Sequence, residues 1–566
     1  MSNSPLDQSA IDRVRSWLDA SDAIVAVGLS VAQRAQHVAA WQLKEDYPHL
    51  GAGRPRIFLP LGFPFSPLRI ELEPSCCLRL PHIEASGNFC HGVVATPNDL
   101  DDPMMAAGRV LERFLDYVRR SADPEWVEEE FHRESHDYWL RYVDASSPPK
   151  GYRTDEVLLE IHTDAKEPQR AEALHLGSRT RAIVSSRDGG PKAAAEAIGW
   201  SLGTIVHGSA LIARLPEDRR WTPITWPKSF ESLSALLDEI TDTTGIVTAW
   251  YGSRQWPNEA PLFVVLLQGS VGFGWRVIPS RTRASGQPRV APVKVSRIDR
   301  RWTLARDHQS EQLEVLTRRR VVVFGCGSVG APIIELLARA GIGSIEVVDP
   351  DLIRPENISR HPLGIQSNGG YKATEFCQRL KNSVPGVKIT PHTMTAQSWL
   401  AGGHPLPDLI LDCTGDRAVR MATAHARARG LAPVPNMMIW MEPFGAAAHV
   451  VTVVGSDQWP GSDPAETAIN VACWPDDVEI THPGCGQGFH PYGMADAWET
   501  AAVATRRAIA LLRQDDTRSD VMSLIQSRAY FEKVWPGITF QRQILLPSGA
   551  ESVVERRSLA DALSGF

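Results

Sequence analysis

The chain has 566 residues, of which 43% are hydrophobic and 22% charged, and its net charge is −7. The length predicts about three domains, each able to bury its own core. The acidic balance gives no reason to expect binding to nucleic acid or to an anionic membrane. No run of about 18 uncharged apolar residues occurs, and the N-terminus is polar rather than basic and then apolar. We therefore predict a cytoplasmic protein without a transmembrane helix or signal peptide.

The eight cysteines include no Cys-x-x-Cys pair. A structural zinc site usually needs such pairs, and a reducing compartment disfavours disulfides, so we expect neither. A functional cysteine in this chain is therefore expected to be a nucleophile rather than a metal ligand.

A first domain is expected over residues 1–145. Apolar residues at helical spacing predict a helix near the N-terminus and another over residues 103–121. Two apolar runs between these helices predict strands at residues 57–59 and 68–70. A segment rich in Ser and Pro at residues 145–151 predicts a linker.

The second domain, residues 146–310, is predicted to be a mixed α/β linker domain of unknown role, and it contains no recognisable chemical motif. A helix is predicted over residues 230–240, and a basic segment with Ser, Gly and Pro at residues 281–293 predicts a loop. Strand-like apolar runs occupy residues 157–161, 182–184, 210–213 and 262–267.

Strands and helices alternate in the third domain, residues 311–566. This predicts a mostly parallel sheet with helices on both faces, a Rossmann-like doubly wound fold, within a chain of α/β class. A strand over residues 320–324 and a helix over residues 331–340 flank the stretch Phe324-Gly325-Cys326-Gly327-Ser328-Val329-Gly330. Glycines at such a junction allow backbone N–H groups to approach a phosphate at the helix N-terminus.

Polar side chains follow the next strands. Asp349 ends a strand over residues 345–348 and can accept hydrogen bonds from ribose hydroxyls, which fits NAD as well as ATP. The polar and charged residues that follow it are Asp351, Asn357, Arg360 and Lys372. The pyrophosphate of NAD does not require so many charged groups. Attack on the α-phosphorus of ATP does, because negative charge builds up on the phosphate oxygens as pyrophosphate leaves. A third strand ends in Asp412-Cys413-Thr414-Gly415-Asp416, which offers carboxylates for magnesium.

This succession of motifs resembles the activating-enzyme superfamily of ThiF type, over residues 311–515. That superfamily includes ubiquitin-activating enzymes and bacterial sulfur-carrier adenylyltransferases. The resemblance implies ATP and Mg²⁺ as cofactors, with Asp349 at the ribose and three side chains at the phosphates. The implied nucleotide-binding set is Gly325, Gly327, Gly330, Asp349, Asp351, Asn357, Arg360, Lys372 and Asp412, with Arg360 and Lys372 also catalytic. The family usually has Asp where this chain has Gly415, so either Asp412 or Asp416 could carry the metal.

Cys485 lies in His482-Pro483-Gly484-Cys485-Gly486-Gln487-Gly488, ahead of a helix predicted over residues 495–512. Gly and Pro on both sides predict an exposed loop. Thioester-forming members of the superfamily place their cysteine in such a loop, where a thiolate can attack an acyl-adenylate because AMP is a good leaving group. Cys473 is the main competitor for this role, and Cys326 and Cys413 are expected to be packing residues.

A second cysteine motif lies in the first domain. The stretch Gly87-Asn88-Phe89-Cys90 and the preceding turn Leu80-Pro81-His82 resemble ubiquitin-conjugating enzymes, in which a His-Pro-Asn turn stands eight residues before the acceptor cysteine. Here His82 occupies the Asn position, eight residues before Cys90. An imidazole N–H could donate the hydrogen bond that stabilises an oxyanion, so we include both residues in the catalytic set.

The combination of a conjugating-like domain, a linker domain and an activating-like domain resembles the bacterial fusion enzymes of CBASS anti-phage systems. The resemblance implies that the C-terminus of a cGAS-like nucleotidyltransferase is adenylated, passed to Cys485, then to Cys90, and finally to an amine of a protein or small molecule. A ubiquitin-like modifier with a glycine-like tail is the alternative partner. Activating domains of this kind usually pair, so we expect a homodimer that binds neither nucleic acid nor membrane.

Two other functions remain open. A sulfur-carrier adenylyltransferase for cofactor biosynthesis would explain the third domain but would leave Cys90 without a role. A nucleotide-binding, non-catalytic scaffold is favoured only by Gly415 at the family's metal-binding position.

Overall fold

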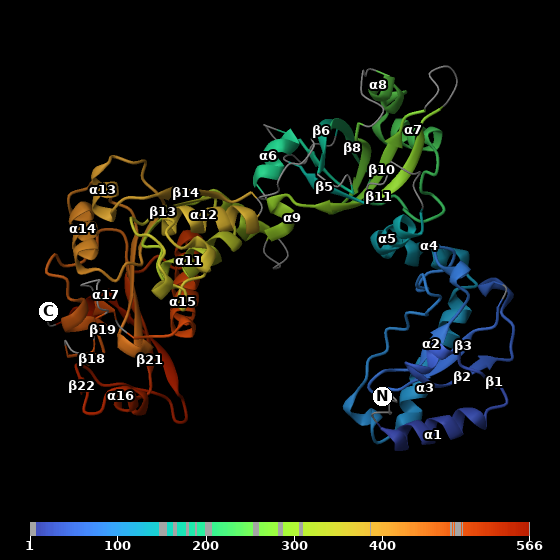
Figure 1. Ribbon diagram of the computed structural model, residues 1–566, viewed down its shortest axis with the longest axis horizontal. Coiled ribbons are helices and arrows are strands. Elements are labelled where there is room, and N and C mark those ends of the chain that lie inside the picture. Colours follow the sequence, from blue (N-terminus) through green and yellow to red (C-terminus); the bar gives the residue numbers. More distant parts are fainter. Residues whose placement is uncertain are drawn as a thin grey trace. The chain divides into compact units, whose positions relative to one another are not determined.

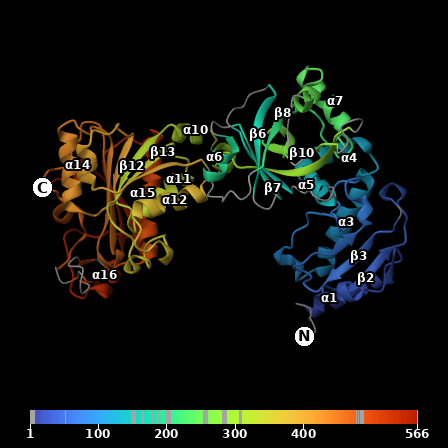
Figure 2. The ribbon, with the colours of Figure 1, turned by 45° about the horizontal axis from the view of Figure 1, so that its top comes forward.

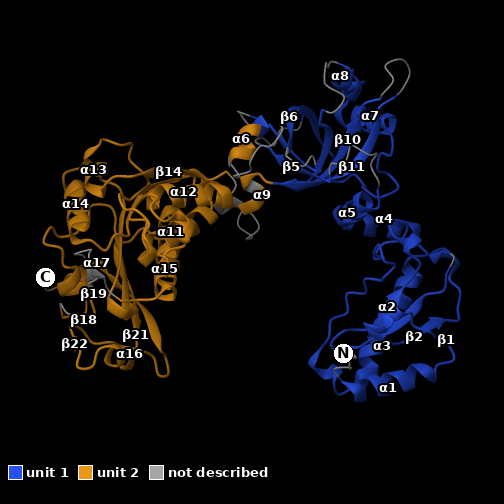
Figure 3. Cartoon of the chain, viewed as in Figure 1, with its two compact units in different colours: residues 1–191, 202–297 blue, residues 192–201, 298–566 orange. Residues whose placement is uncertain are grey.

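The structure is a computed structural model that describes residues 7–564, except for 52, 147–154, 162–166, 177–179, 187–189, 198–205, 253–259, 281–286, 305–309, 385, 476–477, 479, 482–487 and 490. It divides into two compact units (Figure 3). Unit 1 comprises residues 1–191 and 202–297, and unit 2 comprises residues 192–201 and 298–566. The division into three domains at residues 145 and 310 stays a prediction.

Unit 1 begins with a four-stranded antiparallel sheet in the order β1-β2-β3-β4. Helices α1 and α3 share one hydrophobic core with this sheet, and both helices were predicted from their apolar spacing. Most of the apolar residues at helical spacing are buried, but Trp17 is 38% exposed and Met105 is 52% exposed. The elements are α1 (Gln8–Asp19), β1 (Ile24–Val27), α2 (Val31–Arg34), β2 (His37–Leu43), β3 (Arg56–Pro60), β4 (Arg69–Glu71) and α3 (Pro103–Arg120) (Figure 1).

The rest of unit 1 consists of two short helices, α4 (Pro124–Arg133) and α5 (Ser135–Ala145), and a closed barrel in the order β10-β11-β5-β7-β6-β8-β9. Helix α5 packs on the barrel, where the indole N–H of Trp139 donates to the carbonyl of Val293 at 3.1 Å. The barrel elements are β5 (Glu156–Glu160), β6 (Gln169–Leu176), β7 (Arg181–Ser185), β8 (His207–Arg214), α7 (Phe230–Thr241), α8 (Ile246–Gly252), β9 (Leu262–Gln268), β10 (Val271–Ile278) and β11 (Arg289–Arg297). Helix α6 (Gly190–Ala197) crosses the boundary between the units.

The predicted loop at residues 281–293 is wrong from residue 289 onward, because β11 begins there. Its buried positions alternate at Ala291, Val293 and Val295, the period of a strand with one face in a core. The Gly and Pro content obscured this period, and residues 281–286 lie outside the described part of the chain.

Unit 2 is built on an eight-stranded sheet in the order β14-β13-β12-β15-β16-β17-β21-β23. The first five strands are parallel, as predicted, and the last three pair antiparallel. The strands are β12 (Arg320–Phe324), β13 (Ser344–Val348), β14 (Lys388–His392), β15 (Leu409–Asp412), β16 (Asn436–Met441), β17 (Ala447–Val453), β21 (Asp520–Gln526) and β23 (Ser552–Ser558). Short strands outside this sheet are β18 (Ala472–Cys473), β19 (Ile480–Thr481), β20 (Gly488–Phe489) and β22 (Thr539–Phe540).

Helices cover both faces of the parallel part of this sheet. Helices α11, α12 and α15 share one core with it, and α13 and α14 share another on the opposite face, which confirms the predicted doubly wound fold. Figure 2 shows α14 on one side of the sheet and α11, α12 and α15 on the other. The helices are α9 (Arg300–Leu304), α10 (Ser310–Thr317), α11 (Gly330–Arg339), α12 (Lys372–Ser383), α13 (Ala396–Ala401), α14 (Arg417–Ala428), α15 (Met494–Leu512), α16 (Arg528–Val534) and α17 (Leu559–Ala562).

None of the described helices is long and apolar enough to cross a membrane.

Candidate active site

The glycine-rich turn between β12 and α11 has the geometry of a phosphate cradle. Gly325 has φ +87°, which favours glycine, and a Cβ atom on Gly330 would lie 1.9 Å from the carbonyl oxygen of Gly325. A Cβ atom on Gly327 would meet nothing within 4 Å, because Gly327 lines a cavity of about 1210 Å³ at the carboxyl end of the parallel strands. Glycine is therefore required for packing at two positions, and the third lies on the open side of the cavity.

Asp349, at the end of β13, is buried and organises the same turn. Its carboxylate accepts hydrogen bonds from the backbone N–H groups of Cys326 at 2.6 Å and Asp351 at 2.8 Å. Burial raises the pKa of Asp349, and the nearby Lys372 ammonium opposes this shift. Lys372 Nζ lies 3.0 Å from Asp351 Oδ2 and its side chain is only 12% exposed. Most of the predicted nucleotide-binding residues thus line one cavity, although Gly330 and Asp412 are not among its lining residues.

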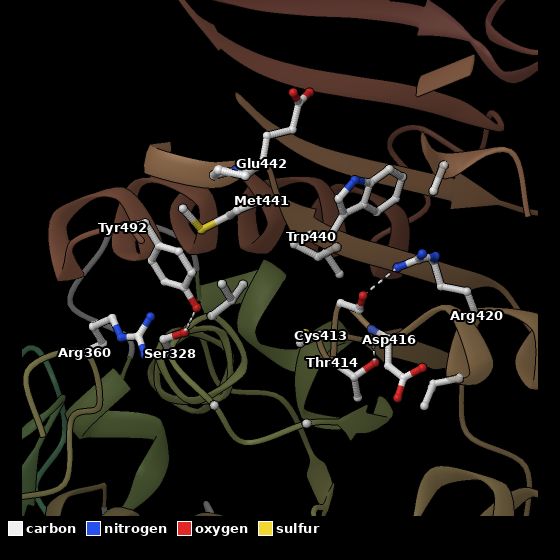
Figure 4. A pocket seen from close by; sticks show the side chains of 18 of the residues that line it. Ser328, Arg360, Cys413, Thr414, Asp416, Arg420, Trp440, Met441, Glu442 and Tyr492 are labelled. Carbon is white, nitrogen blue, oxygen red and sulfur yellow. Dashed lines mark hydrogen bonds between the residues drawn. The ribbon is translucent and has the colours of Figure 1, made fainter. Parts of the chain in front are cut away.

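Arg360, Ser328 and Tyr492 meet on one side of the cavity (Figure 4). The Tyr492 hydroxyl and Ser328 Oγ are hydrogen-bonded at 2.6 Å, and the Arg360 guanidinium carbon lies 4.9 Å from the centre of the Tyr492 ring. Asn357 also lines the cavity, and its side-chain oxygen accepts the backbone N–H of Arg354 at 3.0 Å. Tyr492 was missed from the sequence because it belongs to no motif.

His361 follows Arg360 directly and was also missed. Its Nδ1 accepts the backbone N–H of Leu363 at 3.1 Å, so its Nε2 carries the proton and donates to the carbonyl of Cys326 at 2.7 Å. Burial lowers the pKa of His361 from its ordinary 6.5 to about 4. The neutral imidazole therefore donates a hydrogen bond to the backbone of the phosphate cradle. Its position directly after Arg360 was the only feature of the sequence that indicated a role in the site.

Unit 2 is expected to lose stability as the pH falls from 7 to 5, with His361 as one cause. In the unfolded chain this imidazole binds a proton near pH 6.5, whereas in the folded protein it does so only near pH 4. Its stabilising contribution is present above pH 6.5 and decreases below it, by about 2 kcal/mol at pH 5. Thermal unfolding of wild type and His361→Gln at pH 7 and pH 5 checks this. The variant should show the smaller decrease in Tm; equal decreases would contradict the assignment.

The two candidate metal ligands differ in their surroundings. Asp412 is 1% exposed, and its Oδ1 accepts the Thr414 hydroxyl at 2.6 Å. Its Oδ2 is buried and has no hydrogen-bond partner among the described residues. Burial raises the pKa of Asp412 to about 6. Asp416 is exposed at the cavity, and its Oδ1 accepts the backbone N–H of Ala418 at 2.6 Å to cap α14. Among the described residues no group of three metal-ligand side chains occurs, and Mg²⁺ in such sites is commonly held by one or two carboxylates and the phosphates.

A buried polar network around Glu442 borders the cavity. Glu442 accepts hydrogen bonds from the backbone N–H of Val471 at 2.5 Å, from the Trp474 indole at 2.7 Å and from His449 at 2.8 Å. These bonds hold the segment that contains Cys473, which is exposed and lines the cavity. The predicted nucleophile Cys485 lies outside the described residues. Cys326 and Cys413 are buried, as predicted, and burial raises the pKa of both thiols well above the ordinary value.

In unit 1, Cys90 is exposed in the turn after the short bridge between Ile83 and Phe89. Its backbone N–H donates to the carbonyl of His82 at 2.8 Å, so the structure brings these two predicted residues together. His82 has φ +58°, a left-handed conformation that Asn and His adopt more readily than most residues. A histidine therefore suits the backbone conformation of this turn.

The His82 ring is directed at helix α4 and its end. Its Nε2 lies 3.0 Å from Glu130 Oε2, and its Nδ1 lies 3.6 Å from Glu134 Oε2. The backbone N–H of His82 also donates to the Tyr138 hydroxyl at 2.6 Å. These contacts fix the turn before Cys90 to α4 and α5, and the oxyanion role of His82 stays a prediction.

The chemistry of the cavity suits the ribose and phosphates of a nucleotide. Its glycine cradle opens toward the cavity, its buried carboxylate lies at the end of the second strand, and its cations lie on the phosphate side. The residues that would hold ATP are therefore those at the junction of β12 and α11, at the end of β13 and at the start of α12.

Comparison with known proteins agrees with this reading. Residues 299–473 match the ThiF family. The chain is 23% identical over 422 residues to the "ATP-dependent ubiquitin transferase-like protein Cap2" of Pseudomonas aeruginosa (strain BWHPSA011 / Pa011). This match covers 68% of this chain and 70% of that protein. The match to Cap2 of Vibrio cholerae serotype O1 is 26% identical over 232 residues and covers 38% of this chain and 39% of that protein. The structural match to E. coli MccB, crystallised with AMPCPP and MccA, covers 38% of this chain and 62% of the MccB chain. The two are 15% identical in sequence, with a TM-score of 0.29.

These matches confirm the predicted resemblance to ThiF-type activating enzymes and to ubiquitin transferase-like proteins.

Proposed function

We propose that this chain, a ubiquitin-activating and conjugating-like enzyme with a ThiF-family segment, activates the C-terminal carboxylate of a partner protein with ATP and transfers it through two cysteines to an amine. The observation that carries this proposal is the convergence of the phosphate cradle, Asp349, Arg360 and Lys372 on one cavity that also reaches Cys473. An exposed Cys90 in a separate turn of unit 1 supports a second acceptor.

The chemistry follows from these positions. The partner's carboxylate attacks the α-phosphorus of ATP and releases pyrophosphate, while Arg360 and Lys372 neutralise charge on the phosphate oxygens. A cysteine thiolate of unit 2, Cys485, attacks the carbonyl of the acyl-adenylate, and AMP leaves. The Cys90 thiolate then takes the acyl group by thioester exchange, and an amine attacks this second thioester to form an amide and regenerate the thiol. We assign Mg²⁺ to Asp416, because this carboxylate faces the cavity whereas Asp412 is enclosed.

The partner is proposed to be a protein with a glycine-like C-terminal tail, either a cGAS-like nucleotidyltransferase of a CBASS system or a ubiquitin-like modifier. The name of the Cap2 relatives supports the transferase reading, and their similarity extends over 68% of this chain in one case. A homodimer through unit 2 and a cytoplasmic location are part of the same proposal.

The test is intact mass and non-reducing electrophoresis of the full chain with glycine-ended candidate partners and ATP-Mg²⁺. Wild type, Cys485→Ala, Cys473→Ala and Cys90→Ala are compared. We expect a thiol-sensitive adduct on Cys90 that requires Cys485 but not Cys473. An adduct that requires Cys473 instead would identify Cys473, which lines the cavity, as the first nucleophile.

Two outcomes would support other functions. Formation of AMP without an adduct on any cysteine would favour a sulfur-carrier adenylyltransferase. Nucleotide binding without ATP–pyrophosphate exchange, with every candidate partner, would favour a non-catalytic scaffold.

A further inference from the structure

Tyr492 lines the cavity at the phosphate cradle and follows the hairpin of β19 and β20 in the chain (Figure 4 shows the tyrosine against Ser328 and Arg360). The hairpin ends at Phe489, and α15 begins at Met494. Tyr492 therefore belongs to the short connection from the hairpin to the helix, and its side chain reaches back to the phosphate cradle.

The backbone on both sides of Tyr492 is anchored. The carbonyl of Pro491 accepts the backbone N–H of Phe444, and the backbone N–H of Gly493 donates to Asp496 at 2.7 Å. Because both flanking residues are held, the backbone of this connection fixes the place from which the Tyr492 side chain reaches the cavity.

The two partners of Tyr492 are groups that we assign to the phosphates. The Arg360 guanidinium carbon lies 4.9 Å from the centre of the Tyr492 ring, which is a cation–π contact. The hydroxyl is 2.6 Å from Ser328 Oγ in the cradle, and a tyrosine that donates to this oxygen leaves the serine hydroxyl to donate to a phosphate. The same tyrosine thus orients two phosphate-binding groups.

We propose that Tyr492 is a positioning residue that couples phosphate binding to the order of the connection before α15, residues 491–493. It orients Ser328 and Arg360 toward the phosphates, and bound phosphates in turn hold this connection at the cradle, since the coupling is reciprocal. This inference rests on the proposed adenylation function, and it adds the reason why nucleotide binding and the start of α15 act together.

Hydrogen exchange of the full chain tests the coupling without any partner or reaction. Peptides that cover residues 488–498 are followed with and without AMPCPP, a nucleotide that keeps its α–β bridge intact. In wild type the nucleotide is expected to slow exchange in this segment at least threefold. In Tyr492→Phe, which keeps the ring but loses the hydroxyl, this protection should disappear although AMPCPP still binds.

Ser383→Ala is the control. The Ser383 hydroxyl donates a hydrogen bond to the carbonyl of Arg379 at 2.8 Å in the same unit, and the residue does not line the cavity. Nucleotide-dependent protection should persist in this variant. If Ser383→Ala loses it equally, or if Tyr492→Phe keeps it, the coupling through Tyr492 is wrong.

Kinetics give a second readout. Tyr492→Phe should raise the KM for ATP in pyrophosphate exchange about fivefold with little change in kcat, and Tyr492→Ala should raise it more because Arg360 loses its support. The double variant Ser328→Ala/Tyr492→Phe should have a KM for ATP no higher than that of the more impaired single variant, since both changes remove the same hydrogen bond. Additive increases in KM would contradict a role for this hydrogen bond. Wild type that binds AMPCPP with protection but forms no thioester would instead contradict the proposed relay alone.

Discussion

Replacing Lys372 with alanine is expected to reduce ATP–pyrophosphate exchange by about two to three orders of magnitude. The Lys372 ammonium is enclosed at the start of α12, 3.0 Å from Asp351, and faces the cavity beside the glycine cradle. A cation in this enclosed position neutralises charge that develops as pyrophosphate leaves, and its effect is larger than in water because solvent is largely excluded. The measurement is exchange of labelled pyrophosphate into ATP with a saturating partner.

Lys388→Ala provides the matched control, because Lys388 is an exposed residue of β14 in the same unit and does not line the cavity. Its exchange rate should equal that of wild type. A Lys372→Ala enzyme with wild-type exchange would remove this lysine from the catalytic set. A loss of thermal stability in this variant alone would instead indicate that its pairing with Asp351 is structural.

Replacing Cys90 with alanine is expected to abolish conjugation to the amine, by more than about a thousandfold, while adenylation continues at the wild-type rate. The thiol is the only acceptor that we assign to unit 1, and it is exposed in a turn whose backbone is tied to His82. The acyl group should therefore accumulate on unit 2. Intact mass of the enzyme, together with gel analysis of the conjugated product, measures both steps in one reaction.

Cys77→Ala is the comparison variant. Cys77 is a half-buried cysteine of the same unit, and burial raises the pKa of its thiol, which disfavours the thiolate. Conjugation by Cys77→Ala should match wild type. Product formation by Cys90→Ala would mean that the amine attacks the first thioester directly, and the second acceptor would then be wrong.

The elements around the nucleotide site could be predicted closely from the sequence. The strand predicted at residues 320–324 coincides with β12, and the helix predicted over residues 331–340 differs from α11 by one residue at each end. Apolar runs that are buried on both faces of a sheet, followed by glycines, give a strong local signal because few other structures accept them. The same argument placed Asp349 at the end of its strand.

Other parts were not predictable by the same means. The seven-stranded closed barrel was not predicted, since its closure depends on pairings such as β8 with β9 and β5 with β11, between segments far apart in the chain. Strand β10 was missed as well, because its Gly272 and Gly274 weaken a strand signal. Both glycines lie against Val295 of β11, where a Cβ atom would come within 2.6 Å of its side chain.

By itself, the sequence determined the doubly wound fold of unit 2, the phosphate cradle and the groups that follow each parallel strand. These depend on local periodicity and on the rule that the carboxyl ends of parallel strands share one edge. Only the tertiary structure decided which side chains support that site: His361 beneath the cradle, Tyr492 against Arg360, and Glu130 beside His82. Such contacts join residues that are distant in sequence and follow no period, so their energies exist only once the chain has brought them together.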